Sequence, residues 1–353
     1  MSTDVAAIVA RTPDGPLESG TVTRRDVGPR DVRIDIAWAG ICHSDIHTVR
    51  GDWGQQSYPL TVGHEIAGVV AEVGSDVAGL AVGDRVGVGC MVGSCRACDN
   101  CLAGRENYCD EGFVDTYGAV DRDGTITQGG YSSSVVVDEH FVLALPEAIA
   151  FDTAAPLLCA GITTYSPLKR WGAGPGTRVA VVGMGGLGHM AVKLAVAMGA
   201  EVTVLSRTSA KRADALELGA AAHHATSDPA VLGGLSRSFD LIINTVSAPL
   251  DVDAYLETLA FGGVMANVGA PPEPAKVSLF RLFTNQRSFT GSTIGGIPET
   301  QEMLEFCAEH GIAPGVEVID ASQVNDAWER VLKGDVRYRF VIDAATIGQG
   351  VES

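Results

Sequence analysis

The sequence predicts an α/β protein in which a doubly wound, parallel-sheet domain is inserted into a β-rich domain. A strand, a glycine-rich turn, a helix and a second strand follow one another between residues 178 and 205. The first 150 residues hold short alternating runs and many turns, and helices and strands alternate again after residue 294. We expect residues 1–151 and 295–353 to form one domain and residues 152–294 the other.

The composition limits the classes of partner. Of the 353 residues, 46% are hydrophobic and 19% are charged, which is enough apolar material for two cores. The formal net charge of −18 argues against nucleic acid and anionic membranes as partners, because both require a basic surface. No signal segment opens the chain, and no uncharged apolar run reaches the roughly 18 residues of a membrane span. We expect a cytoplasmic protein.

The first part of the chain is dominated by strand patterns. Residues 5–36 form short alternating runs, broken by Pro13-Asp14-Gly15-Pro16 and Gly28-Pro29-Arg30-Asp31, which favour strands and tight turns. Two motif-bearing elements follow at residues 37–49 and 60–73, and residues 82–89 continue the strand pattern. Through residue 150 this indicates a β-rich, barrel-like domain.

Four of the eight cysteines crowd into one polar loop, C-R-A-C-D-N-C-L-A-G-R-E-N-Y-C. In a long chain of this kind, clustered cysteines favour metal binding over disulfides. Four thiolates can close a tetrahedral zinc site that stabilises structure and performs no chemistry. A redox pair or an iron–sulfur cluster is the alternative. The structural zinc ligands we predict are Cys95, Cys98, Cys101 and Cys109.

The second domain begins with a crossing at residues 151–156 and an apolar helix from residue 157 to 165. Strand patterns then alternate with helical ones, which predicts a doubly wound sheet. After the first strand and its glycine turn, the expected elements are a strand at 201–205, a strand at 240–245, a helix at 252–260 and a strand at 263–268.

Glycines occupy the first turn from strand to helix. Gly183, Gly185 and Gly188 stand where backbone must approach a pyrophosphate, and the N-terminus of the following helix offers free N–H donors. The pattern therefore predicts a dinucleotide site. The alternative is an ordinary glycine-rich turn in a domain without a cofactor.

The end of the second strand of this unit indicates which dinucleotide binds. NAD sites usually carry a carboxylate there, whereas a 2′-phosphate needs cations and no carboxylate. Here the chain reads Ser206-Arg207-Thr208, with Lys211 and Arg212 just beyond. We therefore expect NADP(H). The alternative is that these cations form a solvated helix face.

The last segment has four patterned elements: a helix at 297–310, a strand at 316–319, a helix at 324–333 and a strand at 338–342. The tail from Ala344 shows no pattern.

Three further residues could hold a metal. Cys42, His64 and Cys159 stand beside glycine or polar neighbours. Two thiolates and one imidazole leave zinc an open position, where it can polarise an alcohol or carbonyl oxygen. Taken singly, each residue could equally be a buried packing residue.

The motifs around these residues resemble, in the same order, those of the zinc-dependent medium-chain alcohol dehydrogenases. They are G-I-C-H-S-D-I-H from Gly40, G-H-E-I-A-G from Gly63, the four-cysteine loop, C-A-G-I-T from Cys159 and G-M-G-G-L-G from Gly183. The chain most resembles the branch of cinnamyl alcohol dehydrogenases and bacterial broad-range aldehyde reductases. This resemblance implies a GroES-like barrel and a Rossmann-type cofactor domain.

The resemblance also implies roles for particular residues. Cys42, His64 and Cys159 would hold the catalytic zinc, and Glu65 would approach it during ligand exchange. Asp45 would orient the histidine ligand. Ser44 would pass a proton to or from the substrate oxygen, and His47 would connect this relay to solvent. The NADP-binding branch often carries a serine run at the end of the second strand, and Arg207 departs from that run, so its expected contact rests on charge. The cofactor contacts we expect are Gly183, Gly185, Gly186, Leu187, Gly188, Ser206, Arg207, Lys211 and Thr163.

For four other residues the sequence indicates either no chemistry or two possible roles. Cys90 and Cys307 match no ligand position and are expected to be packing residues, and His189 is expected to be structural. Trp53 either lines the substrate cleft or belongs to a core.

The function we expect is hydride transfer between NADP(H) and a primary alcohol or aldehyde, aromatic or aliphatic. One alternative is an NAD-dependent polyol or sugar dehydrogenase, and another is an idle zinc- and dinucleotide-binding sensor. By analogy with the family, we expect a homodimer or homotetramer.

Overall fold

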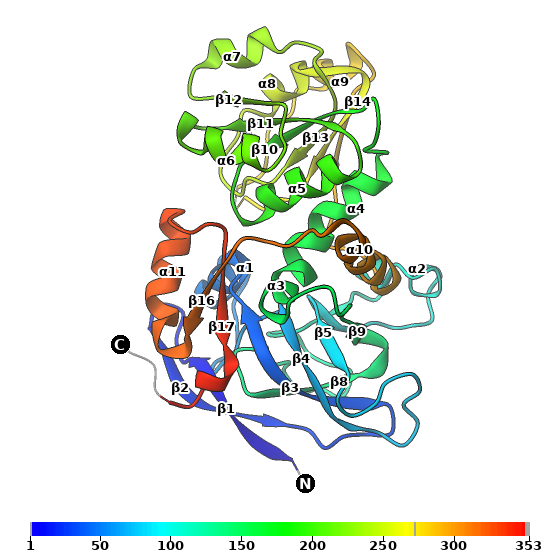
Figure 1. The fold of residues 1–353 in the computed structure, drawn as a ribbon, viewed down its shortest axis with the longest axis vertical. Helices are drawn as coiled ribbons and strands as arrows, with labels where there is room; N and C mark the ends of the chain where they lie inside the picture. Colours follow the sequence, from blue (N-terminus) through cyan, green and yellow to red (C-terminus); the bar gives the residue numbers. More distant parts are fainter. Residues whose placement is uncertain (1, 272, 350–353) are drawn as a thin grey trace. The chain divides into compact units, whose positions relative to one another are not determined.

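The computed structural model describes residues 2–271 and 273–349, and its contacts divide the chain into two compact units (Figure 1). The first is Met1–Cys159 with Gly295–Ser353, and the second is Ala160–Ile294. The final segment of the chain thus lies in the same unit as the first 159 residues. The division falls at 159/160, later than the expected 151/152, so Cys159 lies within the first unit.

The first unit is built on a largely antiparallel sheet with strand order β16-β17-β3-β4-β5-β9, and β8 also pairs with β3. Alternate residues of β3, such as Val32 and Ile34, are fully buried, which is the period-two pattern of a sheet with one face on the core. β1 and β2 form a separate hairpin, and β6 pairs with β7. The strands are β1 Thr3–Ala10, β2 Leu17–Arg24, β3 Asp31–Gly40, β4 Ile66–Val73, β5 Arg85–Val88, β6 Met91–Gly93, β7 Val114–Asp115, β8 Ser134–Asp138, β9 Leu143–Ala144, β16 Val316–Asp320 and β17 Arg339–Asp343.

The helices of the first unit confirm the predictions for the last segment. α10 and α11 have the predicted bounds, and each is followed by a glycine in the left-handed region, Gly311 and Gly334, which ends the helix. The α-helices are α1 His43–Arg50, α2 Asp99–Leu102, α3 Phe151–Pro156, α10 Ile297–His310 and α11 Val324–Lys333. Short 3₁₀ turns are η1 Glu106–Tyr108, η2 Glu139–Phe141, η5 Ala321–Gln323 and η6 Ala344–Thr346.

The second unit contains a parallel sheet, six-stranded within the described residues, in the order β12-β11-β10-β13-β14-β15. This is the doubly wound order 3-2-1-4-5-6 of dinucleotide-binding domains, so the predicted fold is confirmed. Its strands are β10 Arg178–Val182, β11 Glu201–Ser206, β12 Ala222–Ala225, β13 Phe239–Asn244, β14 Leu259–Asn267 and β15 Ser288–Gly291. Its helices are α4 Ile162–Arg170, α5 Gly186–Ala197, α6 Arg212–Glu217, α7 Pro229–Gly234, α8 Val252–Glu257 and α9 Leu279–Phe283, with the 3₁₀ turn η4 Ser209–Lys211.

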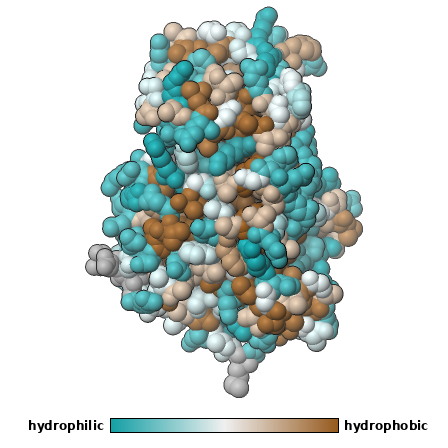
Figure 2. All heavy atoms as spheres, in the orientation of Figure 1, coloured by the Kyte–Doolittle hydropathy of each residue, from teal (hydrophilic) through white to brown (hydrophobic). Residues whose placement is uncertain are grey.

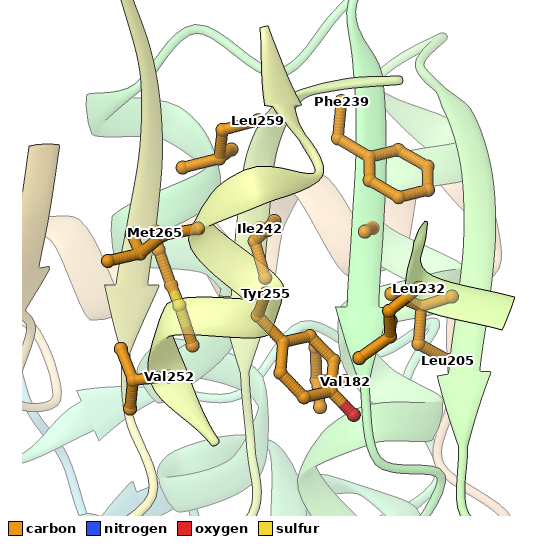
Figure 3. Packing of buried hydrophobic residues seen from close by; sticks show 11 residues of the cluster. Val182, Leu205, Leu232, Phe239, Ile242, Val252, Tyr255, Leu259 and Met265 are labelled. Atoms are coloured by element: carbon orange, nitrogen blue, oxygen red, sulfur yellow. The ribbon is translucent and has the colours of Figure 1, made fainter. Parts of the chain in front are cut away.

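The core on one face of this sheet is shown in Figure 3. Tyr255 and Leu256 of α8 pack with Ile242 of β13 and Met265 of β14, and all four are buried. Burying side chains of this size stabilises the fold by roughly 1.5–3 kcal/mol each. This packing holds β13 and β14 in place, and with them the ends of these strands.

Two local predictions were wrong. The apolar stretch from residue 157 does not form one α-helix: a π-helical turn, η3 Leu157–Gly161, separates α3 from α4. Such turns insert an extra residue into a helix and are often found at functional sites. In addition, α8 ends at Glu257 and β14 already begins at Leu259, because Leu259 pairs with Phe239 across a register irregularity.

On the face drawn in Figure 2, apolar residues form small groups separated by polar ones. In the part of the chain that the structure describes, no helix has both the length and the apolar character needed to cross a lipid bilayer.

Candidate active site and metal centres

Two thiols and an imidazole from three separate segments meet in the first unit. Cys42 is the N-cap of α1, His64 lies just before β4, and Cys159 lies in the π-helical turn. The Sγ atoms of Cys42 and Cys159 are 3.9 Å apart, and the ligand atoms of these residues, His64 and Glu65 all lie within 4.8 Å of one another. All four side chains are buried. The three ligands expected from the sequence are therefore brought together, and their donor chemistry fits zinc.

Local backbone features hold this cluster in place. Gly63 has φ 105°, and a Cβ there would lie 2.5 Å from a ring carbon of Tyr131, so only glycine fits before His64. At the start of α1, Asp45 Oδ2 accepts a hydrogen bond from the Cys42 N–H at 2.8 Å. This contact fixes the direction of the Cys42 side chain.

Asp45 also lies behind the histidine. Its Oδ1 is 3.1 Å from His64 Nδ1, and the Tyr117 hydroxyl is 3.1 Å from the same nitrogen. Asp45 is fully buried and accepts a further hydrogen bond from the Tyr131 hydroxyl at 3.0 Å. Because Nδ1 is occupied, Nε2 is the nitrogen available to a metal.

The pKa values of the two thiols in this cluster are shifted in opposite directions. Contact with Cys159 lowers the pKa of Cys42 well below its usual range. The contact with Cys42, followed by a hydrogen bond with the Cys90 side chain, raises the pKa of the Cys159 thiol. Cys90 is thus adjacent to the cluster, whereas Cys307 is buried and donates to Met303 Sδ at 3.6 Å.

Glu65 is paired with a residue that the sequence did not indicate. Arg339 of β17 donates to Glu65 Oε1, and both side chains are buried. Burial raises the pKa of Glu65 to about 8, while the Arg339 guanidinium opposes that rise. A Cβ on Gly40 would overlap Glu65 Oε2, so this glycine makes room for the carboxylate.

Ser44 and His47 stand one turn apart on α1, and Asp52 lies just beyond its end. Ser44 Oγ lies 3.5 Å from Cys42 Sγ, and His47 lies one turn further along the helix. His47 Nδ1 is 2.7 Å from Asp52 Oδ2, and Asp52 is exposed. Asp52 follows the motif without belonging to it, so no sequence pattern indicated this residue. Trp53 is 46% exposed, and its ring is tilted against that of His47 with the centroids 5.0 Å apart, so it is not a core residue.

The four predicted structural ligands form a second cluster. The ligand atoms of Cys95, Cys98, Cys101 and Cys109 lie within 4.8 Å of one another. Backbone N–H groups point at the sulfurs: those of Asp110 and Cys101 lower the pKa of Cys98 to about 6. Four sulfurs with N–H donors around them fit a closed zinc site.

Glu106 connects this loop to the last segment of the chain. It is 1% exposed, its Oε1 lies 2.9 Å from His140 Nε2, and its Oε2 accepts from the Ile297 N–H, at the start of α10, at 3.0 Å. Although burial raises the pKa of Glu106, these contacts lower it overall. The cysteine loop and α10 are therefore held together by one buried carboxylate.

The glycine turn of the second unit is tightly packed on one side and open on the other. Gly183 has φ 93°, and a Cβ on Gly188 would lie 2.3 Å from Gly183 O. Gly185 is the N-cap of α5, and a Cβ there would meet no described atom within 4 Å. The open side fits a pyrophosphate beside the N–H groups of Gly186, Leu187 and Gly188.

Thr245, which the sequence analysis did not select, lies under the turn. Its Oγ1 donates to Val182 O at 2.8 Å, and it limits the space at Gly183. Thr163 is buried in α4, and His189 is fully buried with Nδ1 3.2 Å from Gly185 O, which agrees with a structural role.

The end of β11 presents cations and no carboxylate. Arg207 is exposed and forms no ion pair with any residue that the structure describes. Lys211 Nζ donates to Met184 O at 2.9 Å, which holds η4 against the glycine turn. Ser206 Oγ contacts Thr208 O and the ring of His223, a residue that no motif had indicated.

Comparison with known proteins supports this fold. Residues 28–147 match the family model described as alcohol dehydrogenase GroES-like domain, and residues 186–309 match that described as zinc-binding dehydrogenase. The chain is 60% identical over 348 residues to NADP-dependent alcohol dehydrogenase C 1 of Mycolicibacterium smegmatis, covering 98% of this chain and 99% of that protein.

Solved structures show the same relationship. A cinnamyl alcohol dehydrogenase from Sorghum bicolor is 43% identical with a TM-score of 0.95, covering 97% of this chain and 98% of that one. A cinnamyl alcohol dehydrogenase from Helicobacter pylori, solved with NADP(H), is 42% identical with a TM-score of 0.92, covering 98% and 99%.

The fold and the two cysteine-containing clusters define a zinc-dependent medium-chain dehydrogenase. The chain belongs to the zinc-dependent alcohol dehydrogenase family. It is an oxidoreductase that uses NADP(H) and zinc.

Proposed function

We propose that this chain interconverts primary alcohols and aldehydes at the cluster of Cys42, His64 and Cys159. The observation that carries the proposal is the buried set of two thiols and one imidazole, which leaves a bound zinc one position for substrate. A zinc held there would supply a Lewis acid for the substrate oxygen, and a bound nicotinamide cofactor would supply the hydride chemistry. Cys95, Cys98, Cys101 and Cys109 would hold a second, structural zinc.

The residues of α1 would handle the proton. Ser44 lies next to Cys42 and can exchange a proton with the substrate oxygen. His47, one turn on, can take that proton at one ring nitrogen while Asp52 holds the other. Asp52 is exposed, so the proton can continue to solvent. Asp45 and Glu65 would position the ligand side chains.

The two alternative functions named from the sequence predict a different cofactor preference or a different turnover. A polyol or sugar dehydrogenase would prefer NADH and small polar substrates, and an idle sensor would turn over nothing. The cation-rich end of β11 and the Ser44, His47 and Asp52 chain favour our proposal. Steady-state assays with NADPH and NADH against aromatic aldehydes, aliphatic aldehydes and polyols test all three.

Cofactor preference is expected to depend on Arg207. An arginine binds a phosphate through charge-assisted hydrogen bonds worth roughly 1.5–3 kcal/mol each. Arg207→Ala should therefore lower kcat/KM for NADPH by about ten- to a hundredfold, at ~1.4 kcal/mol per decade, with little change for NADH.

A paired variant should reverse the preference. Ser206→Asp with Arg207→Ile adds an acceptor for a 2′-OH and repels a 2′-phosphate. Arg237→Ala, an arginine elsewhere in the second unit, is a control for lost positive charge. Equal use of NADH and NADPH by the unmodified enzyme would contradict the assignment of this site.

We also propose that the chain forms a homodimer through the second unit, or a homotetramer made of two such dimers. β15 ends the sheet order, and α9, which precedes it, exposes Leu279, Phe280 and Phe283 by 62–78%. An apolar group of this kind beside a sheet edge is typical of an interface.

We propose the cytoplasm as the location of the protein. The eight cysteines support this location, because none of them forms a disulfide.

Charges on α9 should separate the subunits. Phe280→Asp with Phe283→Asp is expected to shift the mass measured by sedimentation velocity to that of a monomer, because the buried carboxylates would lack partners. Val120→Asp, at an exposed apolar residue of the first unit, should change nothing. A double variant with the same mass as the unmodified protein would exclude this interface.

A further inference from the structure

A buried imidazole lies behind the end of β11. His223 of β12 is 2% exposed, and its Nε2 is 2.8 Å from Ser206 Oγ. Its backbone carbonyl accepts from the Arg212 guanidinium at 3.0 Å, which fixes β12 beside α6. Burial, followed by the nearby Arg212, lowers the pKa of His223, so the ring is neutral near pH 7.

The single proton of the Ser206 hydroxyl determines whether His223 Nε2 donates or accepts in their contact. The Ser206 hydroxyl has one proton, and Thr208 O, 2.9 Å away, can only accept. If the hydroxyl donates to Thr208 O, the proton in its contact with His223 must come from Nε2. Ser206 Oγ then accepts from His223, and its own proton can be redirected without breaking that contact.

The two cofactors make different demands on this hydroxyl. A 2′-phosphate offers only acceptor oxygens, so Ser206 must turn its proton from Thr208 O toward the phosphate. A 2′-OH can donate as well as accept and makes no such demand. A donor behind Ser206 therefore matters for NADP(H) and hardly for NAD(H).

We propose that His223 is a specificity-determining residue for the coenzyme: it donates from Nε2 to Ser206 Oγ and so directs the Ser206 proton to the 2′-phosphate. His223 does not touch the phosphate and acts as a positioning residue through Ser206. The inference rests on the 2′-phosphate site proposed above. It adds a residue that belongs to another strand and to no cofactor motif.

Glutamine and methionine provide a matched pair of variants. Both have side chains of similar length, and a glutamine amide nitrogen can replace Nε2 as donor, whereas methionine has no donor. The measurement is titration of the purified full-length protein with NADP⁺ and with NAD⁺ by calorimetry, which needs no turnover. His223→Phe gives a second donor-free variant of different shape, and thermal melts identify variants that do not fold.

His223→Met and His223→Phe should weaken NADP⁺ about five- to tenfold, the effect of about one hydrogen bond, and NAD⁺ less than about twofold. His223→Gln should keep the NADP⁺/NAD⁺ ratio of the unmodified protein within about twofold. In a Ser206→Ala background, the change from His223 to Met should alter NADP⁺ affinity by less than about twofold, because the group it acts through is gone.

Several results would overturn the inference. They are equal losses for both cofactors, a methionine variant that keeps the ratio, or a full loss in the Ser206→Ala background. In each of these the unmodified protein still prefers NADP⁺, so the proposed 2′-phosphate site survives. An unmodified protein with no preference for NADP⁺ would overturn both the site and this role of His223.

Discussion

Replacing Cys42 with serine is expected to abolish turnover and leave the protein folded. Cys42 supplies one of only two sulfurs in the three-ligand set, and its thiol is the one whose pKa is lowered. Lewis-acid polarisation lowers the activation barrier by several kcal/mol, so its loss should reduce kcat about a thousandfold or more at ~1.4 kcal/mol per decade. Because serine is close in size to cysteine, the melting temperature should change little.

The matched variant Cys98→Ser should show the opposite pattern. Its loop is held to α10 by Glu106, so loss of the second metal would loosen both segments. Closed zinc sites contribute directly to folding, and a cost of several kcal/mol corresponds to a fall in Tm of about 10 °C. Turnover per folded molecule at low temperature should persist.

Elemental analysis and thermal melts check both variants. Each should retain one zinc per chain where the unmodified protein has two. Fully active unmodified protein with a single zinc would contradict the assignment of two sites with separate roles.

The residues of both candidate metal clusters could be selected from the sequence because each is part of a local motif. Cys42, His64 and the four-cysteine loop carry their chemistry in neighbouring residues, and the structure brings each set together. Arg339 is different: it lies 274 residues from Glu65 and belongs to a strand with no motif. Only the pairing of β17 with β3 brings it to the cluster.

The fold could be predicted for the same reason. The prediction failed where a structure depends on residues distant in the sequence. Long periodic segments such as α10 and α11 were found with the correct bounds. β12 was missed because Ala-His-His-Ala has no strand pattern of its own, and it exists only because it pairs with β11. The contact between His223 and Ser206 therefore could not be predicted from the sequence. The π-helical turn at Cys159 likewise follows from packing, since an apolar run alone indicates an ordinary helix.

Ser44→Ala is expected to reduce kcat about 10²-fold or more, the usual scale of positioned proton transfer. The variant keeps the ligand set and loses the one hydroxyl that α1 places beside Cys42. Affinity for NADP⁺, measured by titration, should not change, because the glycine turn and Arg207 belong to the second unit. Ser44→Thr keeps a hydroxyl at the same position and should retain most of the activity. The comparison requires that hydride transfer limits the rate, which a kinetic isotope effect with deuterated coenzyme establishes. If the alanine variant then turns over as fast as the unmodified enzyme, the proton takes another route and Ser44 has no part in it.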